Sequence, residues 1–139
     1  MLWFASEGYS VVGLEMVEEA IQAFLEENEL QAQTQRIDGH LHHKSKPFTI
    51  IEGDIFDLKT GKIQADAWYD RAAMIAIPPE KREAYVEQIR QFTKPNAAGL
   101  LITFHYPQEE MDGPPFSLSD SDVEELFSDG FELERLEQI

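Results

Sequence analysis

The amino-acid sequence predicts an α/β protein with a mostly parallel sheet, and three observations support this prediction. Short apolar runs typical of buried strands alternate with segments whose apolar residues recur at helical spacing. Glycine and proline residues separate these segments, and the chain has no internal repeats or low-complexity tracts. Its 139 residues are enough for one hydrophobic core, so we expect a single domain over residues 1–139.

Five apolar runs predict the strands. The runs at 10–15 (SVVGLE) and 48–52 (FTIIE) are apolar enough to be buried on both faces of a sheet. Residues 65–70 (ADAWYD) form a third strand, and 100–106 (LLITFHY) is the most hydrophobic of all. Residues 131–139 are expected to form the last strand of the chain.

Helices are expected between these runs. Residues 1–7 have the pattern of the end of a helix, which Gly8 stops, and residues 17–28 carry one apolar stripe at helical spacing. Pro78 and Pro79 open a further helix, because the first turn of a helix does not need their missing N–H groups, and Pro95 ends it.

The remaining segments are more polar. Ser121 and Glu124 have capping-box spacing at the start of a last helix, which Gly130 closes. Residues 31–47 are expected to form an exposed loop, which could include a short hairpin. The three histidines of this loop are expected to be solvated, because no carboxylate pattern completes a metal-ligand set around them.

Composition excludes several functional classes. Asp and Glu number 27 against 11 Lys and Arg, which gives a net charge of −16. Such a chain should bind neither nucleic acid nor anionic membranes, since both interactions depend on basic residues. The sequence has no cysteine, no basic leader and no apolar run long enough to span a bilayer. We therefore expect a soluble, cytoplasmic protein.

Two acidic residues follow predicted strands at the end where α/β proteins bind ligands. Glu15 ends the run at 10–15, where a carboxylate can accept hydrogen bonds from both ribose hydroxyls. An acidic helix start explains it equally well. Asp54 follows the run at 48–52 and could accept from an exocyclic amine, with Ile55 and Phe56 against a purine. By itself, however, its pattern favours an ordinary turn.

A third strand end carries Asp70 and Arg71. An arginine there can bind a carboxylate or stabilise a developing anion, although the pair could also be a surface ion pair. The segment 111–120 (MDGPPFSLSD) is stiff and non-helical, and it presents Phe116 as either a substrate wall or part of a rigid connection.

Taken together, the chain resembles the thiopurine S-methyltransferase family. The resemblance rests on MLWFASEGYSVVGLE, GDIFDL, DAWYDRAAMIAIPPEKREAY, LLITFHY and DGPPFSLSDSDVEELF, which follow in family order across essentially the whole chain. It implies a Rossmann-like class I methyltransferase sheet with flanking helices and the cofactor S-adenosyl-L-methionine. The substrate it implies is a small-molecule thiol, such as a thiopurine or another aromatic thiol, or a selenium or tellurium compound.

The same resemblance implies roles for the residues at the strand ends. Glu15 corresponds to the glutamate that holds the cofactor ribose, and Asp54 with Ile55 to the pair along the adenine. Arg71 corresponds to an arginine of the cofactor site close to the thiol, and Asp70 accompanies it in the catalytic region. Methyl transfer then needs no metal, and we expect the protein to act as a monomer.

Compared with the family pattern, the sheet is expected to be incomplete. The glycine-rich motif with the first, central strand, and the last strand with its arginine, would both lie outside residues 1–139. Residues 1–139 alone should then bind S-adenosyl-L-methionine poorly or not at all. The alternative is a truncated, non-catalytic binding or interaction domain; a nucleotide-dependent oxidoreductase is disfavoured, because its glycine fingerprint is absent.

Overall fold

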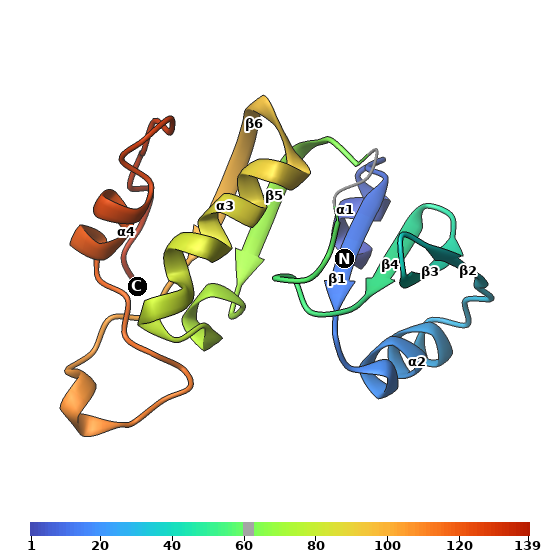
Figure 1. Cartoon of the computed structure of the whole chain (residues 1–139), viewed down its shortest axis with the longest axis horizontal. Helices are drawn as coiled ribbons and strands as arrows, with labels where there is room; N and C mark the ends of the chain where they lie inside the picture. Colours follow the sequence, from blue (N-terminus) through green and yellow to red (C-terminus); the bar gives the residue numbers. More distant parts are fainter. Residues whose placement is uncertain (60–62) are drawn as a thin grey trace. The chain divides into compact units, whose positions relative to one another are not determined.

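A mixed sheet forms around the two apolar runs of the amino-terminal part. The computed structural model of the chain describes residues 1–59 and 63–139. Contacts divide the chain into two compact units, Met1–Gly61 and Lys62–Ile139. Helices accompany strands in both, which confirms the α/β class (Figure 1). The division does not test the prediction of one domain.

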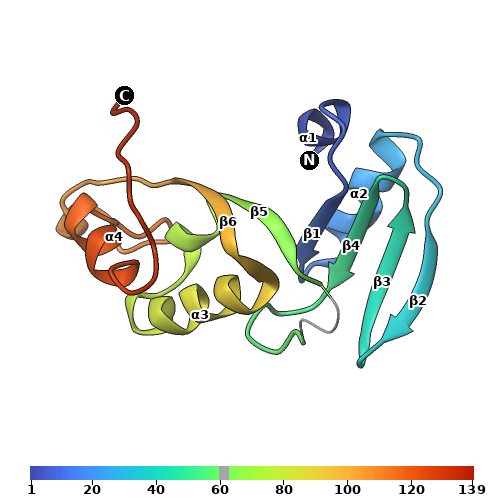
Figure 2. The same ribbon diagram turned by 90° about the horizontal axis from the view of Figure 1, so that it is seen from above.

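The first unit contains a four-stranded sheet in the order β1-β4-β3-β2 (Figure 2). Strand β1 (Val11–Glu15) lies parallel to β4 (Phe48–Glu52), as expected for the two most apolar runs of this unit. Helix α1 (Leu2–Ser6) precedes the sheet, and α2 (Glu18–Glu27) follows β1. Ile21 and Leu25 of α2 pack on Ile50 of β4 to form the core.

The polar segment 31–47 is a hairpin within the sheet rather than a loop, which corrects the sequence-based expectation, although the short hairpin that the expectation allowed is present and β2 is largely exposed. It forms a hairpin of β2 (Gln33–Ile37) and β3 (His40–Ser45), and β3 pairs antiparallel with β4. The hairpin turns at Asp38 and Gly39, whose φ angles are 51° and 86°. An Asp-Gly pair with two positive φ angles is typical of a two-residue hairpin loop. The sheet is therefore mixed rather than mostly parallel.

The second unit contains two parallel strands, β5 (Ala65–Arg71) and β6 (Thr93–Ile102). Between them lie two 3-10 turns, η1 (Met74–Ala76) and η2 (Pro79–Lys81), and helix α3 (Arg82–Phe92). Helix α3 runs alongside the strand pair (Figure 2) and buries one face, with Tyr85, Val86, Ile89 and Phe92 nearly inaccessible. A third 3-10 turn, η3 (Gln108–Glu110), precedes α4 (Asp120–Leu126).

Three local expectations for this unit are wrong. Strand β6 spans Thr93–Ile102 and not residues 100–106. It ends before Phe104 and Tyr106, because the backbone groups of these two residues bond with residues 117 and 118 instead of with β5. The cap of α4 is Ser119, whose hydroxyl accepts from the Asp122 N–H, two residues before the expected position. Residues 131–139 form no strand, and the second half of this segment is exposed.

The expectation of missing strands is not confirmed. Strand β1 lies at one edge of its four-stranded sheet, and β5 pairs with β6 in the described part of the second unit. Neither observation decides whether a further strand belongs to the fold, so this expectation stays a prediction.

Candidate functional site

The carboxyl ends of β1 and β4 meet at one edge of the first sheet. Glu15 and Glu52, the last residues of these strands, are register partners. The Gly53 N–H donates to the Glu15 carbonyl oxygen at 2.9 Å, which joins the two strand ends. Because the strands are parallel, the residues that follow them leave the sheet at the same edge.

One oxygen of the Glu15 carboxylate is hydrogen-bonded to the backbone. Its Oε1 accepts a hydrogen bond from the Val17 N–H at 3.0 Å, just before α2 begins. The side chain is half-buried, and within residues 1–59 and 63–139 its Oε2 accepts no hydrogen bond. The helix-start function that competed with ribose binding is therefore present, and one carboxylate oxygen remains available to a ligand.

Asp54 lies at the same edge and organises a turn. Its Oδ1 accepts from the Phe56 N–H at 3.0 Å, and its carbonyl oxygen accepts from the N–H groups of Asp57 and Leu58. Ile55 is half-buried within this turn. As the sequence favoured, Asp54 is a turn residue, and its second carboxylate oxygen is free to accept a further donor.

Gly53 is required for this turn. Its φ angle is 156°, and a Cβ atom there would come within 2.7 Å of the His40 Nδ1 and 2.9 Å of a Leu58 methyl group. His40 of β3 therefore lies directly against Gly53. The hairpin of β2 and β3 thus helps to shape the edge of the sheet that carries Glu15 and Asp54.

Asp70 is buried near the end of β5, with only 4% of its surface exposed. Its Oδ1 accepts from the N–H groups of Ala73 and Met74, both at 3.1 Å. Its Oδ2 accepts from the Tyr85 hydroxyl at 2.6 Å. Asp70 therefore does not form the surface ion pair with Arg71 that was considered from sequence. Its carboxylate bonds instead to the following turn and to α3.

Arg71 is the last residue of β5 and pairs in register with Ile102, the last residue of β6. Its side chain is exposed. In the part of the chain that the structure describes, the Arg71 guanidinium makes no ion pair or hydrogen bond. It is thus a cation at a strand end that remains free to bind an anion.

The segment that follows β6, up to residue 118, is held in place by hydrogen bonds. The Phe116 N–H donates to the Ile75 carbonyl oxygen at 2.6 Å, and the Leu118 N–H to that of Phe104 at 2.7 Å. The buried Arg82 donates to the Ser117 carbonyl oxygen at 3.1 Å. These bonds fix the proline-containing segment against η1, α3 and the residues after β6, which favours the rigid connection considered from sequence.

Sequence reasoning missed several buried polar groups, among them His43, Tyr85 and the Arg82 described above. His43 of β3 is 5% exposed, and its ring bonds to Glu52 at 2.9 Å and to Thr34 at 3.0 Å, so it is not a solvated loop histidine. Tyr85 binds Asp70 from α3. The signal for Tyr85 was its place on the apolar helix face, where a buried hydroxyl needs a partner.

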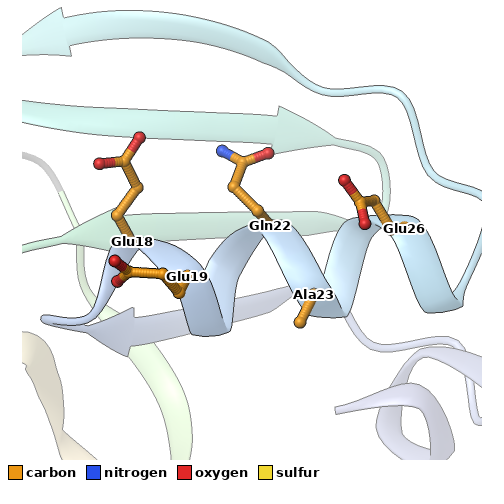
Figure 3. Close-up of a pocket in the computed structure, with 5 residues that line it drawn as sticks. All are labelled: Glu18, Glu19, Gln22, Ala23 and Glu26. Atoms are coloured by element: carbon orange, nitrogen blue, oxygen red, sulfur yellow. The ribbon is translucent and has the colours of Figure 1, made fainter.

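A shallow hollow on α2 is not a plausible binding site. Figure 3 shows Glu18, Gln22 and Glu26 projecting from the same side of the helix, with Glu19 and Ala23 beside them. Its carboxylates repel one another and have no cation partner in the described residues. Those residues also contain no group of three or more His, Asp or Glu side chains placed to hold a metal ion.

The expected site residues fall in both units. Glu15, Asp54 and Ile55 belong to the first, and Asp70 and Arg71 to the second. Each carboxylate or cation lies at or next to the carboxyl end of a strand that has a parallel neighbour. The hypothesis that they line one common edge stays a prediction. No helix of the described residues is both long and apolar enough to cross a bilayer.

Comparison with known proteins gives a consistent result over the full sequence. A family model described as "Thiopurine S-methyltransferase (TPMT)" matches residues 1–139. A curated thiopurine S-methyltransferase of Pseudomonas paraeruginosa is 39% identical over 139 residues, covering 99% of this chain and 64% of the relative. One from Shewanella pealeana is 42% identical over 137 residues, covering 98% of this chain and 63% of the relative. The chain thus spans slightly less than two thirds of these relatives.

Proposed function

Because this chain belongs to the thiopurine S-methyltransferase family, we propose that its protein transfers a methyl group from S-adenosyl-L-methionine to a small-molecule thiol. The observation that carries the proposal is the family match over all 139 residues, together with the name shared by relatives that are 37–42% identical. Since the chain covers about 64% of those relatives, the activity of the whole protein is part of the proposal.

The residues at the edge of the first sheet fit the adenosine part of this cofactor. Glu15 has one carboxylate oxygen without a hydrogen bond in the described residues, which suits a ribose hydroxyl. Asp54 has the same capacity toward an exocyclic amine, and Ile55 follows it in the turn. The carboxylate oxygens of Glu15 and Asp54 are hydrogen-bond acceptors, and the ribose hydroxyls and the exocyclic amine of an adenosine are donors. We assign to these residues binding and orientation of the cofactor, which supplies an electrophilic methyl group on a sulfonium.

Arg71 is assigned to the thiol. An exposed guanidinium without an anionic partner in the described residues would favour a bound thiolate, with the thiol proton released to solvent. The rate then depends mainly on holding sulfur and methyl carbon in line, which is a matter of positioning. Selenium and tellurium acceptors, a monomeric state and a cytoplasmic location stay predictions.

The test uses methyl-labelled S-adenosyl-L-methionine with thiophenol or a thiopurine, and mass spectrometry to identify the methyl thioether. The full-length protein should form labelled product, and Arg71→Ala should reduce turnover of the thiol by about tenfold or more. Arg135→Ala is the matched control, because Arg135 forms an exposed ion pair with Asp120 and should not affect the reaction. Cofactor binding without product formation by any thiol would instead support the non-catalytic alternative.

A further inference from the structure

The turn after β5 contains an unusual backbone conformation. Ala72, which follows Arg71, has a φ angle of +76° although it is not glycine. Alanine rarely adopts this left-handed conformation, because its Cβ then crowds the backbone. Such a conformation persists only where surrounding contacts enforce it, and it is enriched at functional sites.

The contacts that enforce it come from Asp70. The carboxylate spans the turn and accepts from the N–H groups of Ala73 and Met74, both at 3.1 Å. Residues on both sides of Arg71 and Ala72 are thereby held by one buried side chain, and Met74 itself is completely buried. The path of the backbone through Arg71 is therefore fixed from both ends.

Tyr85 holds the carboxylate in turn. It lies on the buried face of α3, fifteen residues further along the chain, and its hydroxyl donates to the Asp70 Oδ2 at 2.6 Å. Burial, reinforced by the nearby Asp70 charge, raises the pKa of the Tyr85 phenol. The hydroxyl therefore keeps its proton and remains a donor at any pH at which the protein works.

We propose that Asp70 and Tyr85 are a positioning pair, which fixes the turn at residues 71–74 so that the Arg71 guanidinium is presented to an anionic thiol substrate. The Arg71 side chain makes no hydrogen bond or ion pair of its own in the described residues, so the backbone of this turn determines from where, and along which Cα–Cβ bond, the side chain leaves the strand. Asp70 does not accept a proton in the reaction: it is 4% exposed and both of its oxygens are already hydrogen-bonded. The role of Arg71 in this inference rests on the proposed function.

Three variants separate positioning from proton transfer. Asp70→Asn keeps a carbonyl oxygen for the Ala73 and Met74 N–H groups and offers an amide N–H to the Tyr85 oxygen, but it has no charge. Asp70→Ala removes all three hydrogen bonds. Tyr85→Phe removes the hydroxyl that joins α3 to the Asp70 Oδ2 and leaves the bonds from the Ala73 and Met74 N–H groups in place. Tyr9→Phe is the matched control, because Tyr9 is 56% exposed and lies outside the second unit.

The first readout is hydrogen exchange at the Ala73 and Met74 amides, which does not depend on activity. Exchange should rise by about tenfold or more in Asp70→Ala, rise less in Tyr85→Phe, and stay close to wild type in Asp70→Asn and Tyr9→Phe. Unchanged exchange in both Asp70→Ala and Tyr85→Phe would overturn the pair. If Asp70→Ala does not fold, as judged by circular dichroism, Tyr85→Phe and Asp70→Asn decide alone.

The second readout is methyl transfer by the full-length protein. The kcat/KM for thiol should fall about tenfold in Tyr85→Phe, while the affinity for S-adenosyl-L-methionine stays within about twofold of wild type, and Asp70→Asn should retain most activity. An inactive Asp70→Asn with normal amide exchange would overturn the proposal, since it would show that the charge or basicity of Asp70 is needed. If the wild type methylates no thiol, the proposed function fails, but the exchange measurement still tests the pair.

Discussion

The structural role of Glu15 leaves room for the binding role proposed for it. Its Oε1 accepts from the Val17 N–H and orients the chain into α2, while its Oε2 has no hydrogen bond in the described residues. A carboxylate has about four acceptor positions, so the first contact does not exclude the second. The helix-start and ribose-binding interpretations of this residue are therefore compatible.

Replacement of Glu15 should reveal both functions. In the full-length protein, Glu15→Ala should weaken S-adenosyl-L-methionine binding about ten- to a hundredfold, because a hydrogen bond to a charged group is worth about 1.5–3 kcal/mol. Isothermal titration calorimetry measures this affinity. Glu19→Ala is a matched control on the exposed surface of α2, and equal affinities for the two variants would contradict the ribose assignment.

The cap of α4 leads to a pH-dependent prediction. Hydrogen bonds from the Ser119 side chain and backbone lower the pKa of Asp122 below its ordinary value of 3.8. Because the folded-state pKa is lowered, the stabilisation is present above the unfolded-state pKa and is lost as the pH falls through the folded-state pKa. Stability should therefore decrease in this acidic range.

The variant that tests the cap is Ser119→Ala. At neutral pH it should reduce the free energy of unfolding by about 0.5–2 kcal/mol, the usual cost of losing an N-cap, and this difference should shrink in acid. Urea denaturation at pH 7 and pH 3 measures both effects. Ser121→Ala, at the cap position expected from sequence, should cost less, and the opposite order would place the cap at Ser121.

At the level of elements, the two strands of the second unit are joined by a close contact between side chain and backbone. Trp68 of β5 pairs in register with Gly99 of β6, and its indole ring stacks on Phe127 at 5.9 Å between centroids. A Cβ atom on Gly99 would lie 2.0 Å from the Trp68 ring. The absence of a side chain at Gly99 is thus what allows tryptophan, β6 and the end of α4 to pack together.

Gly99→Ala should therefore destabilise the protein by about 1–3 kcal/mol, the usual cost of overpacking a core. Urea denaturation followed by tryptophan fluorescence measures this change. Gly13→Ala in β1 is the matched control: the added methyl group would also make a close contact, 2.7 Å, but with the flexible end of Met1, which can move. A loss of stability that is no larger for Gly99→Ala than for Gly13→Ala would contradict the packing argument.

At the level of the whole molecule, charge is the dominant property. With 27 acidic and 11 basic residues, the chain carries a net charge of −16. Binding to DNA or to anionic lipid gains free energy when basic residues displace counterions, and here that contribution is reversed. The thiol of the proposed reaction is small and needs only one local cation, which Arg71 can provide.

We therefore expect no measurable binding to a labelled DNA duplex or to phosphatidylserine vesicles at physiological salt. Fluorescence anisotropy and vesicle co-sedimentation measure the two interactions. An association that weakens steeply as salt is added would contradict this expectation, because it would reveal a basic surface that outweighs the net charge.

Features that depend on neighbouring residues could be predicted from the order of amino acids. The apolar runs at 10–15, 48–52 and 65–70 contain or match β1, β4 and most of β5, and the helical stripe at 17–28 contains α2. The strand end at Glu15 coincides with the end of its run, and β5 ends at Arg71, one residue after its run. Family membership was also readable, because it rests on the order of short motifs along the chain.

Features that depend on distant partners could be established only from the folded chain. The hairpin of β2 and β3 is stabilised by pairing with β4, although its Asp-Gly turn was visible in the sequence. Residues 131–139 have the pattern of a strand, but a strand also needs a partner, which the described residues do not provide. Asp70 resembled a surface or catalytic acid until Tyr85, fifteen residues away, was found bonded to it. Local patterns specify the conformation of a segment, whereas the role of a buried polar group depends on which distant groups the fold brings to it.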